Sequence, residues 1–283
     1  MSMKQATVKE KIGRVLAFIL LVAGAIAFML PLYVTLAMSL KLPSEVANTS
    51  SWAWPVNLTW ENYAKVLTNP NAQFHLFFRN STFITVMSTL GVLVTSALVA
   101  YAFARISFRG RDRLFILLLS TMMLPGIVTM IPTYIMYRYM GWIDTFYPLW
   151  VPAWFGGGAY NIFLLRQFFL GIPRELDEAA VLDGASHATI FWRIIVPNSG
   201  PALATVGIFS FIYSWRDFLG PLVFLNDPEK HTLELGLRTY QSLNQEQWEL
   251  LMAASILVLL PLVVLFLVGQ KFFVKGIVMT GGK

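Results

Sequence analysis

The chain has no cysteine among its 283 residues. Disulfides, iron–sulfur clusters and thiol catalysis all need cysteine side chains, so the sequence excludes them. Charge is also scarce, because 13% of the residues are charged against about a quarter in an ordinary soluble domain. Hydrophobic residues make up 57% of the chain, and its mean hydropathy is +0.63. These values indicate a polytopic membrane protein.

Long apolar runs carry this prediction further. Six of them exceed the ~18 residues that a helix needs to cross a bilayer. They cover residues 15–40, 81–104, 114–137, 146–165, 201–225 and 250–270. We therefore predict an all-α fold with six transmembrane helices in one membrane domain over residues 1–283. A cleavable signal peptide is the alternative for the first run, but its apolar region is typically only ~7–15 residues long, and here apolarity continues to Leu40.

Lysine and arginine set the orientation, because they resist translocation while acids count for little. With the N-terminus inside, fourteen of the 21 basic residues fall in cytoplasmic segments, six fall outside, and Arg216 lies within the fifth run. We predict that both termini and the segment 171–200 are cytoplasmic. The pI of 9.5 then needs no nucleic-acid partner to explain it.

The segment 171–200 predicts two short helices. Pro173 suits a first helical position, Glu175 and Asp177 lie near the positive end of the helix, and Gly184 suits the left-handed residue that ends it. A second helix fits 186–195, ended by Pro197. On the first helix Leu176, Ala179, Ala180 and Asp183 recur at helical spacing and form a stripe of small residues.

Within this segment, Glu178-Ala179-Ala180, Asp183-Gly184-Ala185 and the run from Ile194 to Pro197 resemble the signature loop of the membrane subunits of binding-protein-dependent ABC importers. Val196 stands where the family usually has Leu. Residues 163–169 and 272–276 look like the carbohydrate-uptake type, similar to the inner-membrane permeases of maltose and oligosaccharide transporters. The resemblance covers roughly residues 15–276.

The resemblance implies that residues 171–200 form cytoplasmic coupling helices between helices 4 and 5 and dock on an ATP-binding subunit. The residues expected at or near this contact are Glu178, Ala179, Ala180, Asp183, Gly184, Ala185, Ile194 and Pro197. It also implies that the tail 271–283, through Val274, Lys275 and Gly276, reaches between the ATP-binding subunits. Two alternatives are an amphipathic segment 171–200 that only covers the helix ends, and tail lysines that extend to lipid phosphates.

The implied partners are a second permease subunit in a heterodimer, two ATP-binding subunits, an extracytoplasmic solute-binding protein and membrane lipid. The implied location is a bacterial or archaeal plasma membrane. We expect no catalysis, metal or bound cofactor in this chain, with ATP and Mg on the partner subunits. Gly281-Gly282-Lys283 does not form a phosphate-binding loop, because Ile277 replaces its first glycine and no Ser or Thr follows.

Candidate substrate-pathway residues lie on the fourth and fifth runs. Arg216 and Asp217 are ionisable residues within a predicted span, which marks them as functional candidates. Aromatic and amide side chains typical of sugar sites accompany them: Trp154, Tyr160, Asn161, Tyr213 and Trp215. The alternatives are interfacial anchoring for the aromatics and water contact at a helix end for the charged pair.

The predicted cargo is a sugar, an oligosaccharide or a related polyol or glycerol phosphate. Loops 42–80 and 226–249 suit contact with the solute-binding protein, although they also fit plain connections. Two other functions stay open: an ion-coupled secondary transporter and a membrane scaffold subunit. The first is disfavoured because His75, His187 and His231 all fall in predicted loops, away from a transmembrane proton relay.

Because the chain has no native cysteine, a single Glu178→Cys substitution tests its orientation. An impermeant maleimide should label this cysteine in inside-out vesicles and leave it unlabelled in intact cells. Labelling from outside the cell would contradict the cytoplasmic placement of residues 171–200.

Overall fold

The computed structural model describes the backbone of residues 8–69, 73–242 and 245–280, and the side chains of 13–69, 73–238, 240 and 247–270. The chain divides into two compact units, one formed by residues 1–71 and 237–257 and the other by 72–236 and 258–283. Helix α15 contributes residues to both units. Each unit is described by itself.

The first unit is built around the end of a long helix. It contains α1 (Val8–Ser39), α2 (Pro43–Asn48), α3 (Glu61–Thr68), η5 (Leu237–Tyr240) and the start of α15 (Trp248–Thr280). The buried Asn62 side chain on α3 donates hydrogen bonds to the carbonyls of Ser39, at 2.9 Å, and Lys41, at 2.8 Å. These bonds satisfy carbonyls that the end of α1 leaves open. A two-residue antiparallel pair, β1 (Gln241–Ser242) with β2 (Gln245–Glu246), is a small departure from the predicted all-helical fold.

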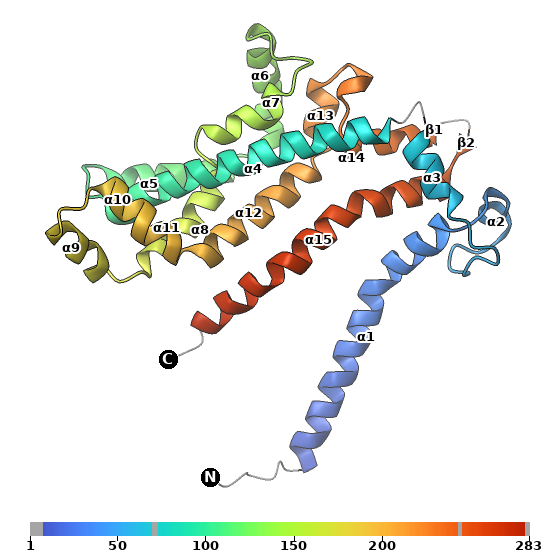
Figure 1. Ribbon diagram of the computed structural model, residues 1–283, viewed down its shortest axis with the longest axis horizontal. Coiled ribbons are helices and arrows are strands. Elements are labelled where there is room, and N and C mark those ends of the chain that lie inside the picture. The colour runs from blue at the N-terminus through green and yellow to red at the C-terminus, as the bar shows by residue number, and fades with distance from the viewer. Residues whose placement is uncertain (1–7, 70–72, 243–244, 281–283) are drawn as a thin grey trace. The chain divides into compact units, whose positions relative to one another are not determined.

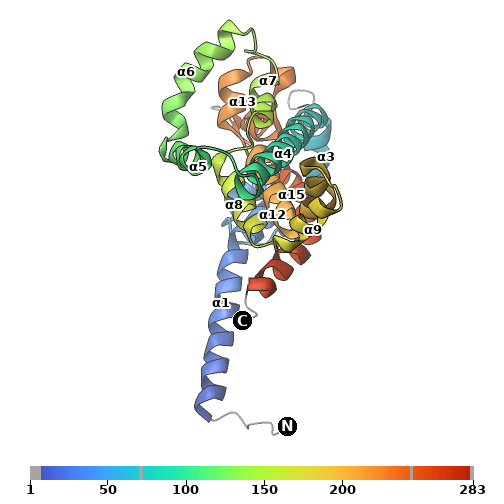
Figure 2. The ribbon, with the colours of Figure 1, turned by 90° about the vertical axis from the view of Figure 1, so that its left-hand side faces the viewer.

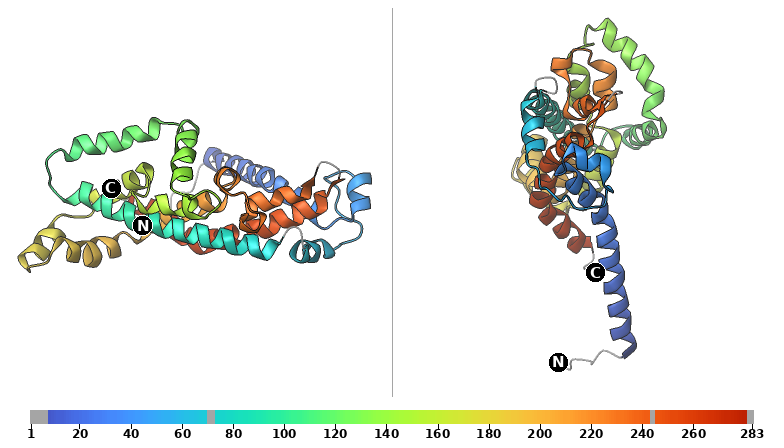
Figure 3. Two further views of the ribbon diagram at one scale, coloured as in Figure 1. Left: turned by 90° about the horizontal axis from the view of Figure 1, so that it is seen from above. Right: turned by 90° about the vertical axis from the view of Figure 1, so that its right-hand side faces the viewer.

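The second unit is organised around the long helix α4 (Phe74–Arg105), which runs along most of it (Figures 1 and 3). Helices α8 and α12 pack along α4. The elements before residue 171 are α5 (Arg111–Ser120), η1 (Thr121–Met123), α6 (Gly126–Tyr139), α7 (Tyr147–Trp150), η2 (Val151–Trp154) and α8 (Ala159–Leu170). Those after it are α9 (Glu175–Leu182), α10 (His187–Ile190), η3 (Phe191–Ile195), α11 (Val196–Asn198), α12 (Gly200–Trp215), α13 (Leu219–Phe224), η4 (Pro228–Lys230) and α14 (Leu233–Gly236).

Small residues on α4 form the centre of this core. Ala97, Ala100 and Ala104 are almost fully buried, and they pack in one cluster with Leu165 and Phe169 of α8. Small side chains let helix backbones approach closely, which is how membrane helices gain packing energy where lipid removes the hydrophobic difference.

Helices α4 and α8 run in the same direction. The indole of Trp154 in η2, which precedes α8, donates to the Met87 carbonyl at 3.1 Å. Further along, the Arg166 side chain of α8 donates to the Phe103 carbonyl at 3.3 Å. A contact later in α4 is thus made by a residue later in the segment that forms α8. The two helices are therefore parallel and end at the same side of the unit.

Proline and glycine break several of the predicted spans. Residues 114–137 form two helices bent by 96° at Leu124-Pro125, a bend visible between α5 and α6 in Figure 2. Residues 146–165 divide into α7, η2 and α8, because Gly156, Gly157 and Gly158 take positive φ angles of 128°, 64° and 84°. The fifth run is also not one helix, since α12 ends at Trp215.

In the described part of the chain, three helices are long and apolar enough to cross a membrane, or up to five if each bent pair is one span. The three are 13–39, 74–105 and 248–270. The fold is therefore that of a helical, polytopic membrane protein. Six spans, cytoplasmic termini and a single domain stay predictions.

Gly157 and Gly110 form a matched pair for testing the α4–α8 contact. Both have positive φ, but a Cβ at Gly157 would lie 2.7 Å from Ser96 Cβ and 2.8 Å from the Ser96 backbone nitrogen, whereas a Cβ at Gly110 would meet nothing within 4 Å. We expect Gly110→Ala to cost about 1 kcal/mol from backbone strain and Gly157→Ala about 1–3 kcal/mol more from overpacking. Thermal unfolding in detergent measures the difference, and equal melting temperatures for the two variants would contradict this packing.

Candidate functional site

Segment 171–200 begins with a helix whose end follows from its sequence. Helix α9 stops at Leu182, and Gly184 has a φ of 80°. The Gly184 amide donates to the Val181 carbonyl at 3.0 Å, and the Ala185 amide donates to the Ala180 carbonyl at 2.9 Å. This bonding pattern is a Schellman motif, which needs a left-handed residue at the glycine position. The predicted role of Gly184 in ending the helix is confirmed.

The second helix of the segment does not end where the sequence predicted. Ser186 caps it by accepting from the Thr189 amide at 3.3 Å, but Pro197 does not stop it, and helical structure continues to Asn198. The reason is the π-helical segment η3 (Phe191–Ile195). Proline lacks an N–H and clashes with the carbonyl one turn earlier in a regular α-helix, and the wider π turn precedes it here. The chain then bends by 80° into α12.

Helix α9 presents most of its surface to the outside of the unit. Asp177 and Ala180 are partly buried, and the other residues from Glu175 to Leu182 are exposed. Apolar side chains are among them, since Leu176, Val181 and Leu182 are 43%, 56% and 89% exposed. Of the predicted stripe, Ala180 therefore packs against the core, whereas Leu176, Ala179 and Asp183 face outward. Glu178 is also exposed, and the result is an accessible surface that combines apolar and acidic groups.

The inner side of α9 is joined to α4 by an ion pair. Arg105 Nη1 lies 3.2 Å from Asp177 Oδ2, with 3% and 19% of the two side chains exposed. A cavity of about 520 Å³ adjoins the pair, and Tyr101, Arg105, Glu178 and His187 are among the residues that line it. Sequence reasoning counted Arg105 only as a basic residue that sets orientation. The signal that it missed is the position of Arg105 directly after the small-residue face of α4.

The structure does not gather the seven candidate substrate-pathway residues into one site. Trp215 is 2% exposed, and its indole donates to the Val258 carbonyl at 3.1 Å. Trp154 is bonded to Met87, as described above, and the Asn161 side chain donates to the Gly157 carbonyl at 2.8 Å. The polar ends of these three side chains therefore serve packing within the unit.

The remaining four candidates lie at the surface or at a helix start. Tyr160 and Tyr213 are 50% and 83% exposed. Arg216 is exposed just after the end of α12. Asp217 accepts a hydrogen bond from the Gly220 amide at 3.0 Å, in the first turn of α13.

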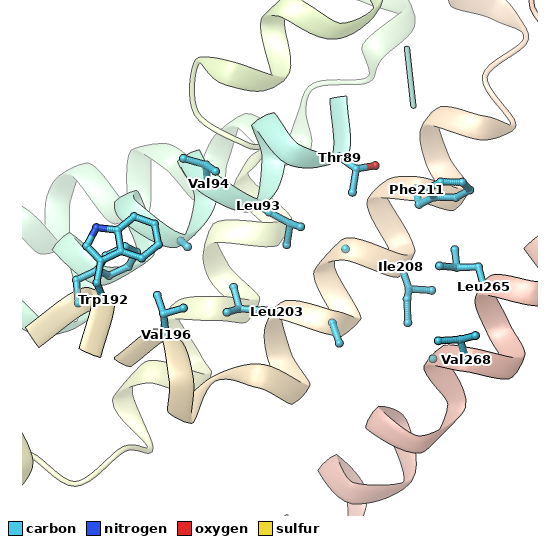
Figure 4. A pocket seen from close by; sticks show the side chains of 15 residues that line it. Thr89, Leu93, Val94, Trp192, Val196, Leu203, Ile208, Phe211, Leu265 and Val268 are labelled. Carbon is cyan, nitrogen blue, oxygen red and sulfur yellow. The ribbon is translucent and has the colours of Figure 1, made fainter. Parts of the chain in front are cut away.

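A second cavity, of about 510 Å³, lies between α4, α12 and α15 (Figure 4). Apolar side chains such as Leu93, Leu203, Ile208 and Leu265 line it. Its polar lining is limited to Thr89 Oγ1 and the Trp192 indole among the described side chains. A sugar needs several convergent hydrogen-bonding groups, so this cavity by itself does not fit one.

At the opposite end of α4, polar groups hold the segment 226–236. The Asn80 side chain donates to the carbonyls of Glu229, at 2.8 Å, and His231, at 3.0 Å. Asp144 accepts from Lys230 Nζ at 2.9 Å and from the amides of Asn226 and Asp227, each at 3.0 Å. Asp144 thus fixes the start of this segment, and Asn80 fixes its middle.

The same contacts set the charge state of Asp144. The hydrogen bond from Lys230, followed by that from the Asp227 amide, lowers the pKa of Asp144 from 3.8 to about 2. The hydrogen bond to Asp144 also raises the pKa of Lys230. Both groups are therefore charged at neutral pH.

No group of three or more His, Cys, Asp or Glu side chains that could hold a metal ion occurs within the described part of the chain. The tail residues Val274, Lys275 and Gly276 lie outside the residues whose side chains are described. Their predicted contact with ATP-binding subunits stays a prediction.

Comparison with known proteins agrees with the signature segment. The model of the family described as "Binding-protein-dependent transport system inner membrane component" matches residues 81–278. The chain belongs to this family. As an inner membrane component of a binding-protein-dependent transport system, it is a transport subunit of the ABC permease type.

Similar proteins match this permease over most of its length. An arabinooligosaccharides transport system permease from Halalkalibacterium halodurans is 33% identical and covers 81% of each chain. An sn-glycerol-3-phosphate transport system permease from Yersinia pestis is 34% identical, over 92% of this chain and 94% of that protein. A crystal structure of a bacterial ABC transporter involved in the import of the acidic polysaccharide alginate matches with a TM-score of 0.84 at 25% identity, over 96% of this chain and 100% of that chain.

The lowered pKa of Asp144 predicts how pH affects this permease. The pKa of Asp144 is lower in the folded than in the unfolded state, so its ionised carboxylate stabilises the fold above the ordinary pKa of about 4. This contribution to the free energy of unfolding is lost as the pH falls from about 4 to about 2. We expect Asp144→Asn to lower the melting temperature by about 1–3 °C at pH 7 and by less at pH 3. Glu229→Gln, at an exposed acid of the same loop, is the control. A difference that stays constant with pH would contradict the assignment.

Proposed function

We propose that this chain is the permease subunit of an ATP-driven importer for a carbohydrate or a related phosphorylated polyol. The observation that carries the proposal is the exposed surface of α9, which lies in the signature segment of the family. On this surface the acid Glu178 lies one turn before Leu182, on the same face of the helix, and both are exposed. A helix that is anchored on one side and apolar on the other fits a groove of a partner protein.

The partner on this surface is an ATP-binding subunit. This chain has no phosphate-binding loop, so hydrolysis takes place on two such subunits with their own ATP and Mg. The contact comprises residues 171–200, with Glu178, Ala179 and Asp183 facing the partner and Gly184 setting the turn. Val274, Lys275 and Gly276 of the tail add a second contact. The chain itself is not a catalyst.

The solute reaches this chain from an extracytoplasmic solute-binding protein. The family is defined by dependence on such proteins, and the segment 226–236, held by Asn80 and Asp144, is the surface offered to it. The excess of Lys and Arg in the predicted cytoplasmic segments favours an orientation with residues 226–236 outside the cell and residues 171–200 in the cytoplasm. The membrane is a bacterial or archaeal plasma membrane. Closure of the ATP-binding subunits would then pull α9 and switch the helices between inward-open and outward-open states.

The substrate class rests on the relatives, whose names refer to arabinooligosaccharides and glycerol 3-phosphate. The cavity between α4, α12 and α15 supplies too few polar groups for a sugar, and the polar cavity beneath α9 lies in the segment that we assign to the ATP-binding subunit. The pathway therefore lies at the interface with a second permease subunit, in a heterodimer. Exposed groups such as Tyr213 and Arg216 are candidates for that interface.

Uptake into proteoliposomes tests the proposal. The complex of this chain with its ATP-binding subunits, second permease and solute-binding protein is assayed with radiolabelled maltose, arabinooligosaccharide and glycerol 3-phosphate. We expect ATP-dependent uptake of at least one of them. Uptake driven by an ion gradient without ATP would indicate a secondary transporter, and co-purification without any ATPase would indicate a scaffold.

Two substitutions test the role of α9 in this complex. We expect Glu178→Lys and Gly184→Asp to abolish uptake while membrane insertion stays normal, because the first reverses the charge of the docking surface and the second strains a residue at φ 80°. Asp112→Lys, at an exposed acid outside residues 171–200, is the matched control and should retain uptake. Normal uptake by both test variants at normal expression would refute the docking role.

A further inference from the structure

We propose that Arg105 is the positioning residue that makes α9 move as one body with α4 and α8. The inference rests on the proposed function, because it concerns how motion of an ATP-binding subunit reaches the membrane helices. It assigns a mechanical role to a residue outside the signature segment.

The first observation is the set of partners of one guanidinium group. Arg105 Nη2 donates to the carbonyls of Phe169, at 2.5 Å, and Ile172, at 2.6 Å. Those carbonyls belong to the last turn of α8 and to the residues just after it. The same side chain lies 3.2 Å from Asp177 on α9. One residue on α4 therefore binds the end of α8 and the inner face of α9 together.

The second observation is a reciprocal contact. Arg166 on α8 donates to the Phe103 carbonyl in the last turn of α4, and its guanidinium carbon lies 4.1 Å from the centre of the Phe115 ring. Each of the two parallel helices thus has its last turn bound by an arginine of the other. Cations are favourable at helix C-termini because the open carbonyls carry partial negative charge. This arrangement locks α4 and α8 into a single rigid pair.

The third observation is how little else holds α9. No residue of α9 is fully buried, and the cavity of about 520 Å³ separates part of its inner face from α4 and α10. Besides its chain ends, α9 is attached through Ala180, which packs on the core, and through Asp177. Among the described residues, Arg105–Asp177 is the ion pair in which both side chains are at least four-fifths buried.

Burial makes the Arg105–Asp177 ion pair costly to break. Removing one partner of a buried ion pair leaves an uncompensated charge, which is strongly unfavourable. Asp177 therefore stays with Arg105 when α9 is pulled, and the force passes to the α4–α8 pair. Without the ion pair, α9 would tilt into the adjacent cavity, and α4 and α8 would not move with it.

Two variants and two controls test this role. Arg105→Met removes the guanidinium, and Asp177→Asn removes only the charge of its partner. Their matched controls are Arg174→Met and Glu175→Gln, which change exposed residues next to the same site. For spin-label distance measurements on the chain alone in nanodiscs, each variant also carries Leu98→Cys on α4 and Leu182→Cys on α9, at positions 45% and 89% exposed.

In the chain alone, we expect the wild type and the controls to have one narrow 98–182 distance. Arg105→Met and Asp177→Asn should broaden this distance. In the complete complex, assayed without the added cysteines, these two variants should lower the binding-protein-stimulated ATPase rate roughly 2- to 30-fold. If Arg105→Met fails to insert, Asp177→Asn decides the question.

Narrow distances and normal stimulation in Asp177→Asn would overturn the inference. Failure of the proposed function has a different signature, since the wild-type chain would then recruit no ATPase. The 98–182 distance distribution of the chain alone in nanodiscs would still show whether Arg105 and Asp177 fix α9 to α4.

Discussion

The carbonyl groups in the last turn of a helix have no partner within that helix, and near a membrane core there is little water to replace one. In this chain Arg105 and Arg166 satisfy such carbonyls at the ends of α8 and α4. Both arginines lie where the two helices end side by side. Each arginine donates to a backbone carbonyl in the last turn of the neighbouring helix. The relative position of the two helices, and of the α9 segment that follows α8, depends on these bonds.

The second unit combines one unbroken helix with several interrupted ones. Helix α4 is unbroken over 32 residues and presents small residues to its neighbours, so its contacts are close and its shape is fixed. Proline and glycine interrupt the elements around it, as at Leu124-Pro125 and at Gly156 to Gly158. Each interruption leaves backbone groups that need new partners, and several of these are supplied by side chains such as Asn161. A stiff central helix surrounded by jointed ones suits a protein that changes conformation without losing its core.

Much of the fold follows from composition and local signals. Apolar runs identified the long helices α1, α4 and α15, and Gly184 predicted the end of α9, because both signals act within one stretch of chain. The break at residues 124–126 was not predicted, since apolarity is the same in one span and in two bent helices. A helix end near Arg216 and Asp217 was predicted only as the alternative to a substrate-pathway role. The continuation of the second helix past Pro197 was also missed, because a π turn has no signal in a single sequence.

The site residues also divide into those that local sequence predicts and those that depend on tertiary contacts. Glu178 and Gly184 could be selected from the sequence because they form part of a recognisable spacing. Arg105 could not, since its role comes from partners at Phe169, Ile172 and Asp177, which only folding brings together. The aromatic candidates illustrate the opposite error. Trp154 and Trp215 are typical of sugar sites by residue type, but their indole nitrogens are already bonded to backbone carbonyls, so residue type alone did not distinguish packing from binding.

Two cavities of the second unit bear on how such a chain works within a larger assembly. The cavity between α4, α12 and α15 is lined almost entirely by apolar groups, whereas the one beneath α9 is lined by Arg105, Asp177, Glu178 and His187. A solute that needs hydrogen bonds gains little in the first, and the second lies in the segment proposed to bind the ATPase. Under the proposed function, the polar groups that recognise a sugar therefore come in part from a second subunit placed against this chain. The task of this chain is then to convert the movement of α9 into a displacement of α4 and α8, which opens or closes a pathway that two subunits form together.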